Sequence, residues 1–259
     1  MSEQAAIAAG DELVIGVLGG MGPQASADFL AKLVAATPVQ REQDHLRVLL
    51  DSNPKVPDRN RAIAAGATGD NGASATDGPG PVLAAMARGL EQAGANLLVM
   101  ACNTAHAFEA DIRAAISVPF VSMIEEACDA CARGLPGLRR VGVLAAQGCL
   151  DAGLYQRALA RRGYEALLLA APQQAHFMQL LYRIKLGDLS SELRAEMRTL
   201  AMNLIDAGAD ALVAGCTEVP LVLDPADLPQ PLVDATANLA QRCVRYARRL
   251  EALPADALR

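Results

Sequence analysis

The sequence predicts an α/β fold of two similar lobes, each a parallel sheet packed between layers of helices. Three observations support this prediction. Short apolar runs alternate with longer alanine-rich stretches, and within each short run apolar residues follow one another without alternating with polar ones. In addition, the first half of the chain resembles the second. A strand that is covered on both faces reads as a continuous apolar run, which is typical of parallel sheets under helices. With 259 residues, 52% of them hydrophobic, the chain can form one large core or two cores of roughly 100 to 150 residues each.

The predicted strands occupy the short apolar runs. These runs stand at 14–18, 46–50, 97–101, 141–145, 166–170 and 211–214. Between them leucine, isoleucine and methionine recur at helical spacing, so the connecting segments are predicted to be helices.

An internal repeat divides the chain. Ile15-Gly-Val-Leu-Gly-Gly resembles Val141-Gly-Val-Leu-Ala-Ala, and later in each half a buried run ends in a cysteine, Cys102 in the first and Cys216 in the second. The distance from the glycine of the first motif to this cysteine is 86 residues in the first half and 74 in the second. The surplus lies close to the glycine- and alanine-rich segment 65–81, which we predict to be an inserted surface loop.

The repeat also predicts the division into lobes. We assign residues 1–122 and 235–259 to the first lobe, with 1–12 as an N-terminal tail, and residues 123–234 to the second. A helix that begins near Ala235 is expected to return to the first lobe. Two similar lobes that face each other place their strand ends, and therefore Cys102 and Cys216, at one cleft.

Composition and charge argue against several classes of protein. The 23 Lys and Arg against 29 Asp and Glu give a net charge of −6, and aromatic residues make up 3% of the chain, so no nucleic-acid partner is expected. No segment offers the roughly 18 apolar residues of a membrane span, and the N-terminus lacks the basic region of a signal peptide. Six cysteines without regular spacing favour reduced thiols, and we expect a cytoplasmic protein.

The glycine turn after the first predicted strand formally fits a dinucleotide-binding fingerprint. The motif is Gly20-Met-Gly-Pro-Gln-Ala25, but the acid that closes the next strand is Asp51, 31 residues beyond Gly20 instead of about 20. Pro23 also removes an N–H donor that a phosphate would need. We therefore favour a turn that lines a small-molecule cleft, and a dinucleotide-dependent oxidoreductase remains the alternative from another class.

Two of the six cysteines are candidates for chemistry. Cys102 and Cys216 each end a strand where a helix is expected to begin, and a helix N-terminus favours the thiolate and lowers the thiol pKa. Cys128 and Cys131 lie within a predicted helix, no second ligand pair with zinc spacing accompanies them, and we expect no metal site. Cys243 is interpreted in the same way, as a packed thiol in the C-terminal helix.

Two further features stand near the candidate cleft. His106 follows Cys102 by four residues, which at the start of a helix would let its ring face the thiol and change the thiol pKa. Alternatively the ring only caps the helix or packs in the core, and the sequence leaves both interpretations open. The segment from Asp51 to Arg59 contains two prolines and follows a predicted strand, so it is suited to presenting a cation to a substrate carboxylate. An ordinary surface loop would have a similar sequence. His45 and His176 receive no role.

Seven motifs in order resemble the aspartate/glutamate racemase superfamily, and within it the aspartate racemase branch. They are Gly19-Gly-Met-Gly-Pro23, Thr37-Pro with Arg41-Glu-Gln-Asp-His45, Asn53-Pro with Val56-Pro-Asp-Arg59, Cys102-Asn-Thr-Ala-His106, Met123-Ile-Glu-Glu126, Ile184-Lys-Leu-Gly187 and Gly215-Cys-Thr-Glu-Val219. The resemblance covers nearly the whole chain. Glutamate racemases typically carry His after the second Cys-Thr, where this chain has Glu218.

The resemblance implies a racemase without a cofactor that works with two bases, Cys102 and Cys216, one on each face of the α-carbon. It implies that Arg59 and Lys185 hold a dicarboxylic amino acid, most simply aspartate, and that the active form is a homodimer. The implied substrate-binding set is Met21, Gly22, Asn53, Arg59, Asn103, Thr104, Lys185, Thr217 and Glu218. Alternatives within the superfamily are a broad-specificity or glutamate racemase and a maleate-type isomerase.

One loop departs from the branch. Aspartate racemases usually have a threonine-rich loop and then a serine after the first strand of the second half, where this chain has Ala146, Cys149 and Ala152. We hypothesise that substrate choice is altered or broadened, with Cys149 as a third thiol near the cleft.

Overall fold

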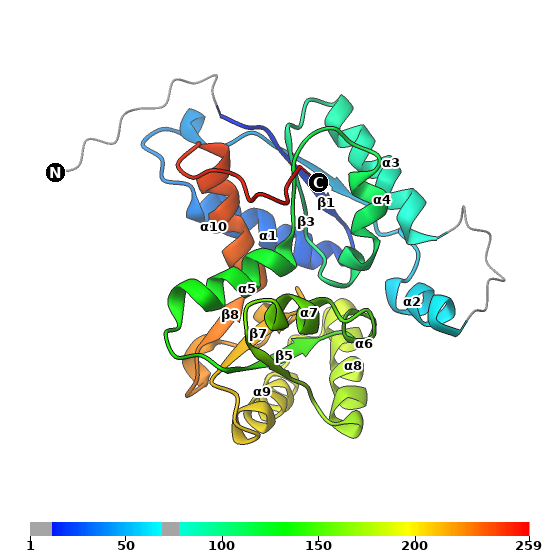
Figure 1. Cartoon of the computed structure of the whole chain (residues 1–259), viewed down its shortest axis with the longest axis vertical. Coiled ribbons are helices and arrows are strands. Elements are labelled where there is room, and N and C mark those ends of the chain that lie inside the picture. Colours follow the sequence, from blue (N-terminus) through cyan, green and yellow to red (C-terminus); the bar gives the residue numbers. More distant parts are fainter. Residues whose placement is uncertain (1–11, 69–77, 259) are drawn as a thin grey trace.

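The computed structural model describes residues 12–68 and 78–258, and it contains two parallel sheets with helices on both faces of each (Figure 1). The first sheet has four strands in the order β2-β1-β3-β4, and the second has four in the order β6-β5-β7-β8. Their bounds are β1 (Ile15–Gly19), β2 (Val48–Ser52), β3 (Leu97–Met100), β4 (Phe120–Val121), β5 (Arg140–Ala145), β6 (Glu165–Leu167), β7 (Ala211–Gly215) and β8 (Leu232–Asp234). The same strand order in both sheets confirms the α/β class and the internal repeat.

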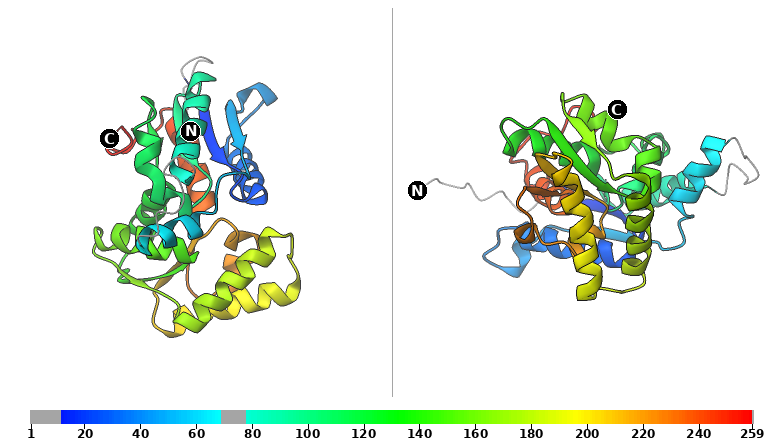
Figure 2. Two further views of the ribbon diagram at one scale, coloured as in Figure 1. Left: turned by 90° about the vertical axis from the view of Figure 1, so that its right-hand side faces the viewer. Right: turned by 90° about the horizontal axis from the view of Figure 1, so that it is seen from below.

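Helices connect the strands. Within the described residues they are α1 (Pro23–Ala36), α2 (Arg59–Thr68), α3 (Pro79–Gln92), α4 (Glu109–Arg113), α5 (Met123–Gly134), α6 (Gln147–Asp151), α7 (Leu154–Ala160), α8 (Ala171–Lys185), α9 (Ser191–Asp206) and α10 (Ala235–Ala247). Short 3-10 turns span Glu42–Asp44, Thr104–Phe108, Val219–Leu221 and Pro225–Asp227. Figure 2 shows α8 and α9 side by side on the second lobe, where their apolar faces cover one side of its sheet.

Some predicted boundaries differ from the structure. The ends of the predicted loop 65–81 are helical, because α2 runs to Thr68 and α3 begins at Pro79. The centre of that loop and the predicted tail up to residue 11 lie outside the described residues. The edge strands β4 and β8 were not predicted, since two or three residues are too few for a periodic signal.

Close packing in each sheet depends on the glycine at the second position of the repeated motif, Gly16 in the first half of the chain and Gly142 in the second. A Cβ at Gly16 would lie 2.3 Å from Leu98 Cδ2, and one at Gly142 would lie 2.4 Å from Leu212 Cδ2. The matching clashes show that the repeat extends to side-chain packing, because each glycine admits a leucine from the neighbouring strand.

One apolar cluster joins the two sheets. It contains fully buried residues of β1, β3, β5 and β7 together with those of α5, α7 and α10. After leaving the second sheet the chain returns to the first, where the backbone N–H of Leu13 donates to Ala247 O at 2.9 Å and that of Phe120 donates to Ala257 O at 2.9 Å. The helices α5 and α10 thus lie between the two sheets (Figure 1). Their packing in the shared apolar cluster holds the two sheets together.

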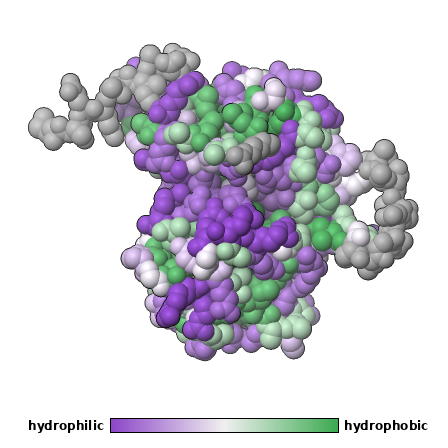
Figure 3. All heavy atoms as spheres, in the orientation of Figure 1, coloured by the Kyte–Doolittle hydropathy of each residue, from purple (hydrophilic) through white to green (hydrophobic). Residues whose placement is uncertain are grey.

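The surface in Figure 3 carries many hydrophilic side chains where the lobes meet, with apolar residues scattered above and below. In the part of the chain that the structure describes, no helix has the length and hydrophobicity to cross a bilayer.

Candidate active site

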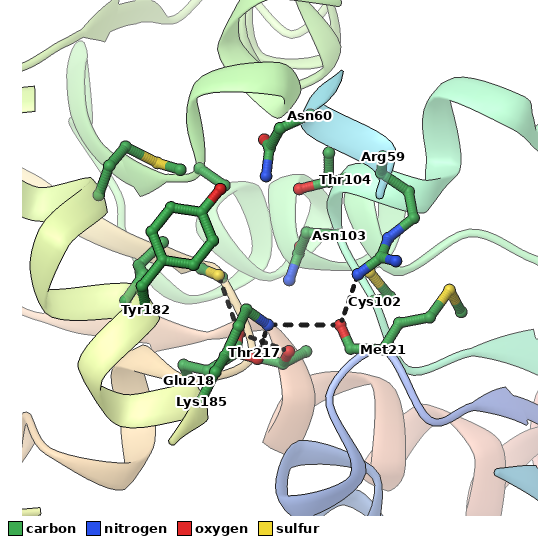
Figure 4. Close-up of a pocket in the computed structure, with 14 residues that line it drawn as sticks. Met21, Arg59, Asn60, Cys102, Asn103, Thr104, Tyr182, Lys185, Thr217 and Glu218 are labelled. Carbon is green, nitrogen blue, oxygen red and sulfur yellow. Dashed lines mark hydrogen bonds and ion pairs between the residues drawn. The ribbon is translucent and has the colours of Figure 1, made fainter. Parts of the chain in front are cut away.

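A pocket lies where the carboxyl ends of β1, β3 and β7 approach one another (Figure 4). It is lined by Met21, Arg59, Asn60, Cys102, Asn103, Thr104, Ala146, Met178, Leu181, Tyr182, Lys185, Cys216, Thr217 and Glu218. Parallel strands place the residues that follow them at one edge of the sheet, and here two such edges face each other. The fold thereby brings together Cys102 and Cys216, which are 114 positions apart in the sequence.

Both cysteines are buried in this pocket. Cys102 is 5% exposed and Cys216 is 6% exposed. The free space at the centre is about 20 Å³, which holds about one water molecule.

A chain of polar contacts links Cys216 to a cation. The Cys216 thiol donates to Glu218 Oε2 at 3.0 Å, and Thr217 Oγ1 donates to the same oxygen at 3.2 Å. The other carboxylate oxygen, Oε1, forms an ion pair with Lys185 Nζ. Glu218 is 3% exposed, so this carboxylate is held out of bulk water and is balanced by Lys185.

The environment of Cys216 contradicts the predicted lowering of its pKa. Burial raises the pKa of this thiol well above its ordinary value, and the adjacent Glu218 carboxylate raises it further, while Lys185 acts in the opposite direction. The residues that follow form only a 3-10 turn, Val219–Leu221, so the dipole of an α-helix is absent there. Cys216 is therefore a protonated thiol in the free protein, suited to donate a proton.

Two cations from different lobes converge on one carbonyl. Arg59 Nη2 and Lys185 Nζ each lie 3.4 Å from Met21 O, and Arg59 Nη1 also donates to Val56 O at 3.0 Å. Burial acts to lower the pKa of Lys185, but the Glu218 carboxylate together with the nearby Cys216 and Cys102 sulfurs acts to raise it. The net shift of the pKa is upward, so the ammonium is charged at neutral pH. The site thus presents two positive charges and one carboxylate.

Asn103, next to Cys102, offers a hydrogen-bond donor to the pocket. Its side chain is buried at 2% exposure, its Oδ1 accepts from the Tyr155 hydroxyl at 2.6 Å, and its Nδ2 has no partner among residues 12–68 and 78–258. Figure 4 shows the amide nitrogen pointing toward the middle of the pocket. A buried N–H₂ without a partner is costly, and a ligand oxygen would satisfy it.

His106 has a structural role. Its Nε2 accepts from the backbone N–H of Met123 at 3.1 Å, so the ring proton sits on Nδ1, which is 2.8 Å from Cys102 O. Burial lowers the pKa of this imidazole, which stays neutral. Of the two interpretations that the sequence left open, the ring caps and packs: it ties the end of β3 to the start of α5 and faces the carbonyl of Cys102.

Two residues of the predicted binding set lie outside the pocket lining. Asn53 Oδ1 accepts from the Lys55 N–H at 3.0 Å and its Nδ2 contacts Met86 Sδ at 3.6 Å, so its side chain serves its own loop. Gly22 lies behind the ion pair, where a Cβ would be 3.3 Å from Glu218 Oε1. The remaining predicted residues line the pocket.

The altered loop reaches the pocket through Ala146 and not through Cys149. Cys149 is fully buried in the main apolar cluster and is absent from the lining, although Cys102 is near enough to contribute to the raised pKa of its thiol. Ala152 directly follows α6 and does not line the pocket either. Cys149 is thus a third thiol near Cys102 that does not line the pocket, and Cys128, Cys131 and Cys243 are likewise buried free thiols.

Four residues that line the pocket were not predicted from the sequence. Asn60 follows Arg59 at the start of α2, and its Oδ1 accepts from the backbone N–H of Gly148 at 2.8 Å across the lobes. The other three, Met178, Leu181 and Tyr182, lie on α8 at seven, four and three positions before Lys185. Helical spacing backward from Lys185 is the signal that could have found them.

One amide of the glycine turn is already engaged and is not free for a phosphate. Gly20 N–H donates to Ser26 Oγ at 2.8 Å, and a Cβ at Gly20, whose φ is +87°, would lie 2.2 Å from Asn53 N. The glycine thus lets the segment after β2 approach the turn, which weakens the dinucleotide alternative.

Comparison with known proteins agrees with this geometry. The model of the Asp/Glu/Hydantoin racemase family matches residues 18–243. The chain is 26% identical over 247 residues to the broad specificity amino-acid racemase of Bacillus subtilis, covering 89% of this chain and 96% of that protein. It is 35% identical over 176 residues to the glutamate racemase of a Roseiflexus species, covering 64% of this chain and 62% of that protein. The Picrophilus torridus aspartate racemase structure superposes with a TM-score of 0.78 at 25% identity, over 91% of this chain and 94% of that one.

Proposed function

Because the chain belongs to the Asp/Glu/Hydantoin racemase family, we propose that it racemises an amino acid with Cys102 and Cys216 as the two acid–base groups. Racemases are isomerases, so the chain is an isomerase. The observation that carries the assignment of the thiols is their convergence in one buried pocket, each at the carboxyl end of a central strand of a different sheet.

The proton balance needs one thiolate and one thiol. A thiolate takes the α-proton, so that an S–H bond forms as the Cα–H bond breaks, and the thiol opposite releases its proton as the new Cα–H bond forms. Since Cys216 is protonated beside Glu218, we assign it as the donor in the direction in which Cys102 removes the α-proton. After turnover the two cysteines have exchanged roles: Cys102 carries the proton taken from Cα and Cys216 is the thiolate. The starting state returns when Cys102 releases a proton to solvent and Cys216 takes one up from solvent.

The polar groups of the pocket fit the zwitterionic part of an amino acid. The Asn103 amide and the Arg59 guanidinium are donors for a carboxylate, and Glu218 is an acceptor for an ammonium group. In a pocket closed to bulk water, such donors stabilise negative charge that develops next to the α-carbon.

Aspartate is the substrate that we propose first. Its two carboxylates match the two cations, Arg59 and Lys185, which lie on either side of Met21 O. A broader amino-acid range is the second candidate, supported by the apolar wall of Ala146, Met178 and Leu181 and by the likeness to the Bacillus subtilis enzyme. Homodimerisation and a cytoplasmic location stay predictions, and analytical ultracentrifugation tests the first.

Proton NMR in D₂O tests the proposal. The purified protein, without added cofactor, is incubated with L-aspartate, L-glutamate and a panel of neutral and basic amino acids while the α-proton signals are followed. We expect loss of the α-proton signal of at least one amino acid, aspartate first, and no loss with Cys102→Ser or Cys216→Ser. Cys243→Ser, at a buried thiol outside the pocket, is the matched control. No exchange with any amino acid would refute the proposal and favour an isomerase that acts on another dicarboxylate.

A further inference from the structure

Tyr155 connects the ends of the two strands that carry the cysteines. Tyr155 lies on α7, in the same lobe as the second sheet, and is fully buried. Its hydroxyl donates a hydrogen bond at 2.6 Å to Oδ1 of Asn103, the residue after Cys102. Its ring packs on the residue before Cys216, because a Cβ at Gly215 would lie 2.8 Å from Tyr155 Cε2. One side chain outside the pocket lining therefore contacts both halves of the site.

The hydroxyl of Tyr155 is bonded to the oxygen end of the Asn103 amide, and the nitrogen end faces the pocket. A side-chain amide has an acceptor oxygen and a donor nitrogen, and the two exchange places by rotation. With Oδ1 engaged by the hydroxyl, Nδ2 points into the pocket and has no partner in the described part of the chain. Burial raises the pKa of Tyr155 well above its ordinary value, so the hydroxyl keeps its proton and can donate.

We propose that Tyr155 is a positioning residue of the racemase site, which acts by holding the Asn103 amide with its N–H₂ toward the substrate carboxylate. The inference rests on the proposed function for the nature of the ligand, while the orientation itself stands on the contact between the two side chains. Without the hydroxyl the amide rotates, and in the rotated state its oxygen faces a carboxylate or a carbanion, which it repels.

A double-mutant cycle tests this role. Tyr155→Phe keeps the ring that packs on Gly215 and removes only the hydroxyl, and we expect kcat/KM to fall about tenfold or more, the size expected for loss of one buried hydrogen bond. If Tyr155 acts through Asn103, adding Tyr155→Phe to Asn103→Ala lowers kcat/KM no further. Equal losses in both backgrounds, or no loss in the single variant, would overturn the proposal. Tyr164→Phe, on the same lobe and outside the pocket lining, is the control and is expected to leave kcat/KM unchanged.

Nitrogen-15 NMR of the Asn103 side chain gives a readout that needs no turnover. The two N–H₂ signals are assigned by their absence in Asn103→Ala, and Tyr155→Phe is expected to shift them or broaden them as the amide begins to rotate. Unchanged Asn103 signals in Tyr155→Phe would contradict the proposal even if activity falls. If the wild-type protein exchanges the α-proton of no amino acid, the racemase assignment fails, while these signals still decide whether Tyr155 orients Asn103.

Discussion

Replacing Glu218 with Gln tests how the pocket controls the second thiol. The substitution keeps the size of the side chain and removes the negative charge that lies 3.0 Å from Cys216 Sγ. It leaves the Lys185 ammonium, which lowers the pKa of Cys216, without its carboxylate partner. Both changes act in one direction: the pKa of the Cys216 thiol falls and the thiolate becomes more abundant at a given pH.

The size of the effect follows from the geometry. Two unit charges 3.0 Å apart interact with about 5 to 6 kcal/mol at an effective dielectric constant of about 20. The Lys185 ammonium offsets part of this repulsion. A tenfold gain in thiolate requires only about 1.4 kcal/mol of it, so we expect alkylation of Cys216 at pH 8 to become at least about tenfold faster.

Iodoacetamide labelling followed by peptide mass spectrometry measures this rate for each cysteine separately. Glu196→Gln on α9 is the matched control, because Glu196 pairs with His176 and Arg183 and does not line the pocket. Labelling of Cys216 in Glu218→Gln that is no faster than in the wild-type protein would refute the electrostatic reasoning. Faster labelling with lost racemisation is the combined result that we expect, since we propose Glu218 also as the acceptor for the substrate ammonium group.

Two further predictions concern stability, measured as free energy of unfolding in urea. Gly142→Ala places a Cβ 2.4 Å from Leu212 Cδ2 and is expected to lower the free energy of unfolding by about 1 to 3 kcal/mol. Gly89→Ala, in open space on α3, is the control and is expected to raise the free energy of unfolding by up to about 1 kcal/mol. Equal effects of the two substitutions would contradict the close packing of Gly142 against Leu212. Burial raises the pKa of the Cys131 thiol to about 11 and also raises that of Cys243, so these thiols stay protonated in the fold and ionise on unfolding. Stability is therefore full below about pH 8.5 and falls above it, and Cys243→Ala should reduce the slope of that fall by about 1.4 kcal/mol per pH unit. A slope that Cys243→Ala leaves unchanged would contradict the assignment.

The strands and the cysteines could be predicted because their signals are local. Continuous apolar runs mark the central strands, and the repeated run that ends in cysteine places Cys102 and Cys216 at equivalent ends. Arg59 and Lys185 were predicted from motifs, and the structure brings both to the pocket. Residues that depend on local pattern or motif were thus accessible from the sequence.

The remaining features depend on contacts between distant segments. The raised pKa of Cys216 results from its burial against the carboxylate of Glu218, and no spacing in the sequence shows that Cys216 donates to Glu218 or that this carboxylate is shielded from water. Tyr155 meets Asn103 only because α7 packs beside the end of β3 in three dimensions. The same holds for Asn60, whose contact with Gly148 crosses between the lobes.

The stereochemistry of deuterium incorporation tests the two-thiol mechanism most directly. Early in the reaction with one enantiomer in D₂O, product and remaining substrate are separated on a chiral column and their deuterium content is measured by mass spectrometry. Two bases on opposite faces predict deuterium in the product enantiomer and almost none in the recovered substrate, because the thiol that delivers the proton is not the one that removed it. Comparable deuterium in both enantiomers from the earliest times would contradict the mechanism and indicate a single base.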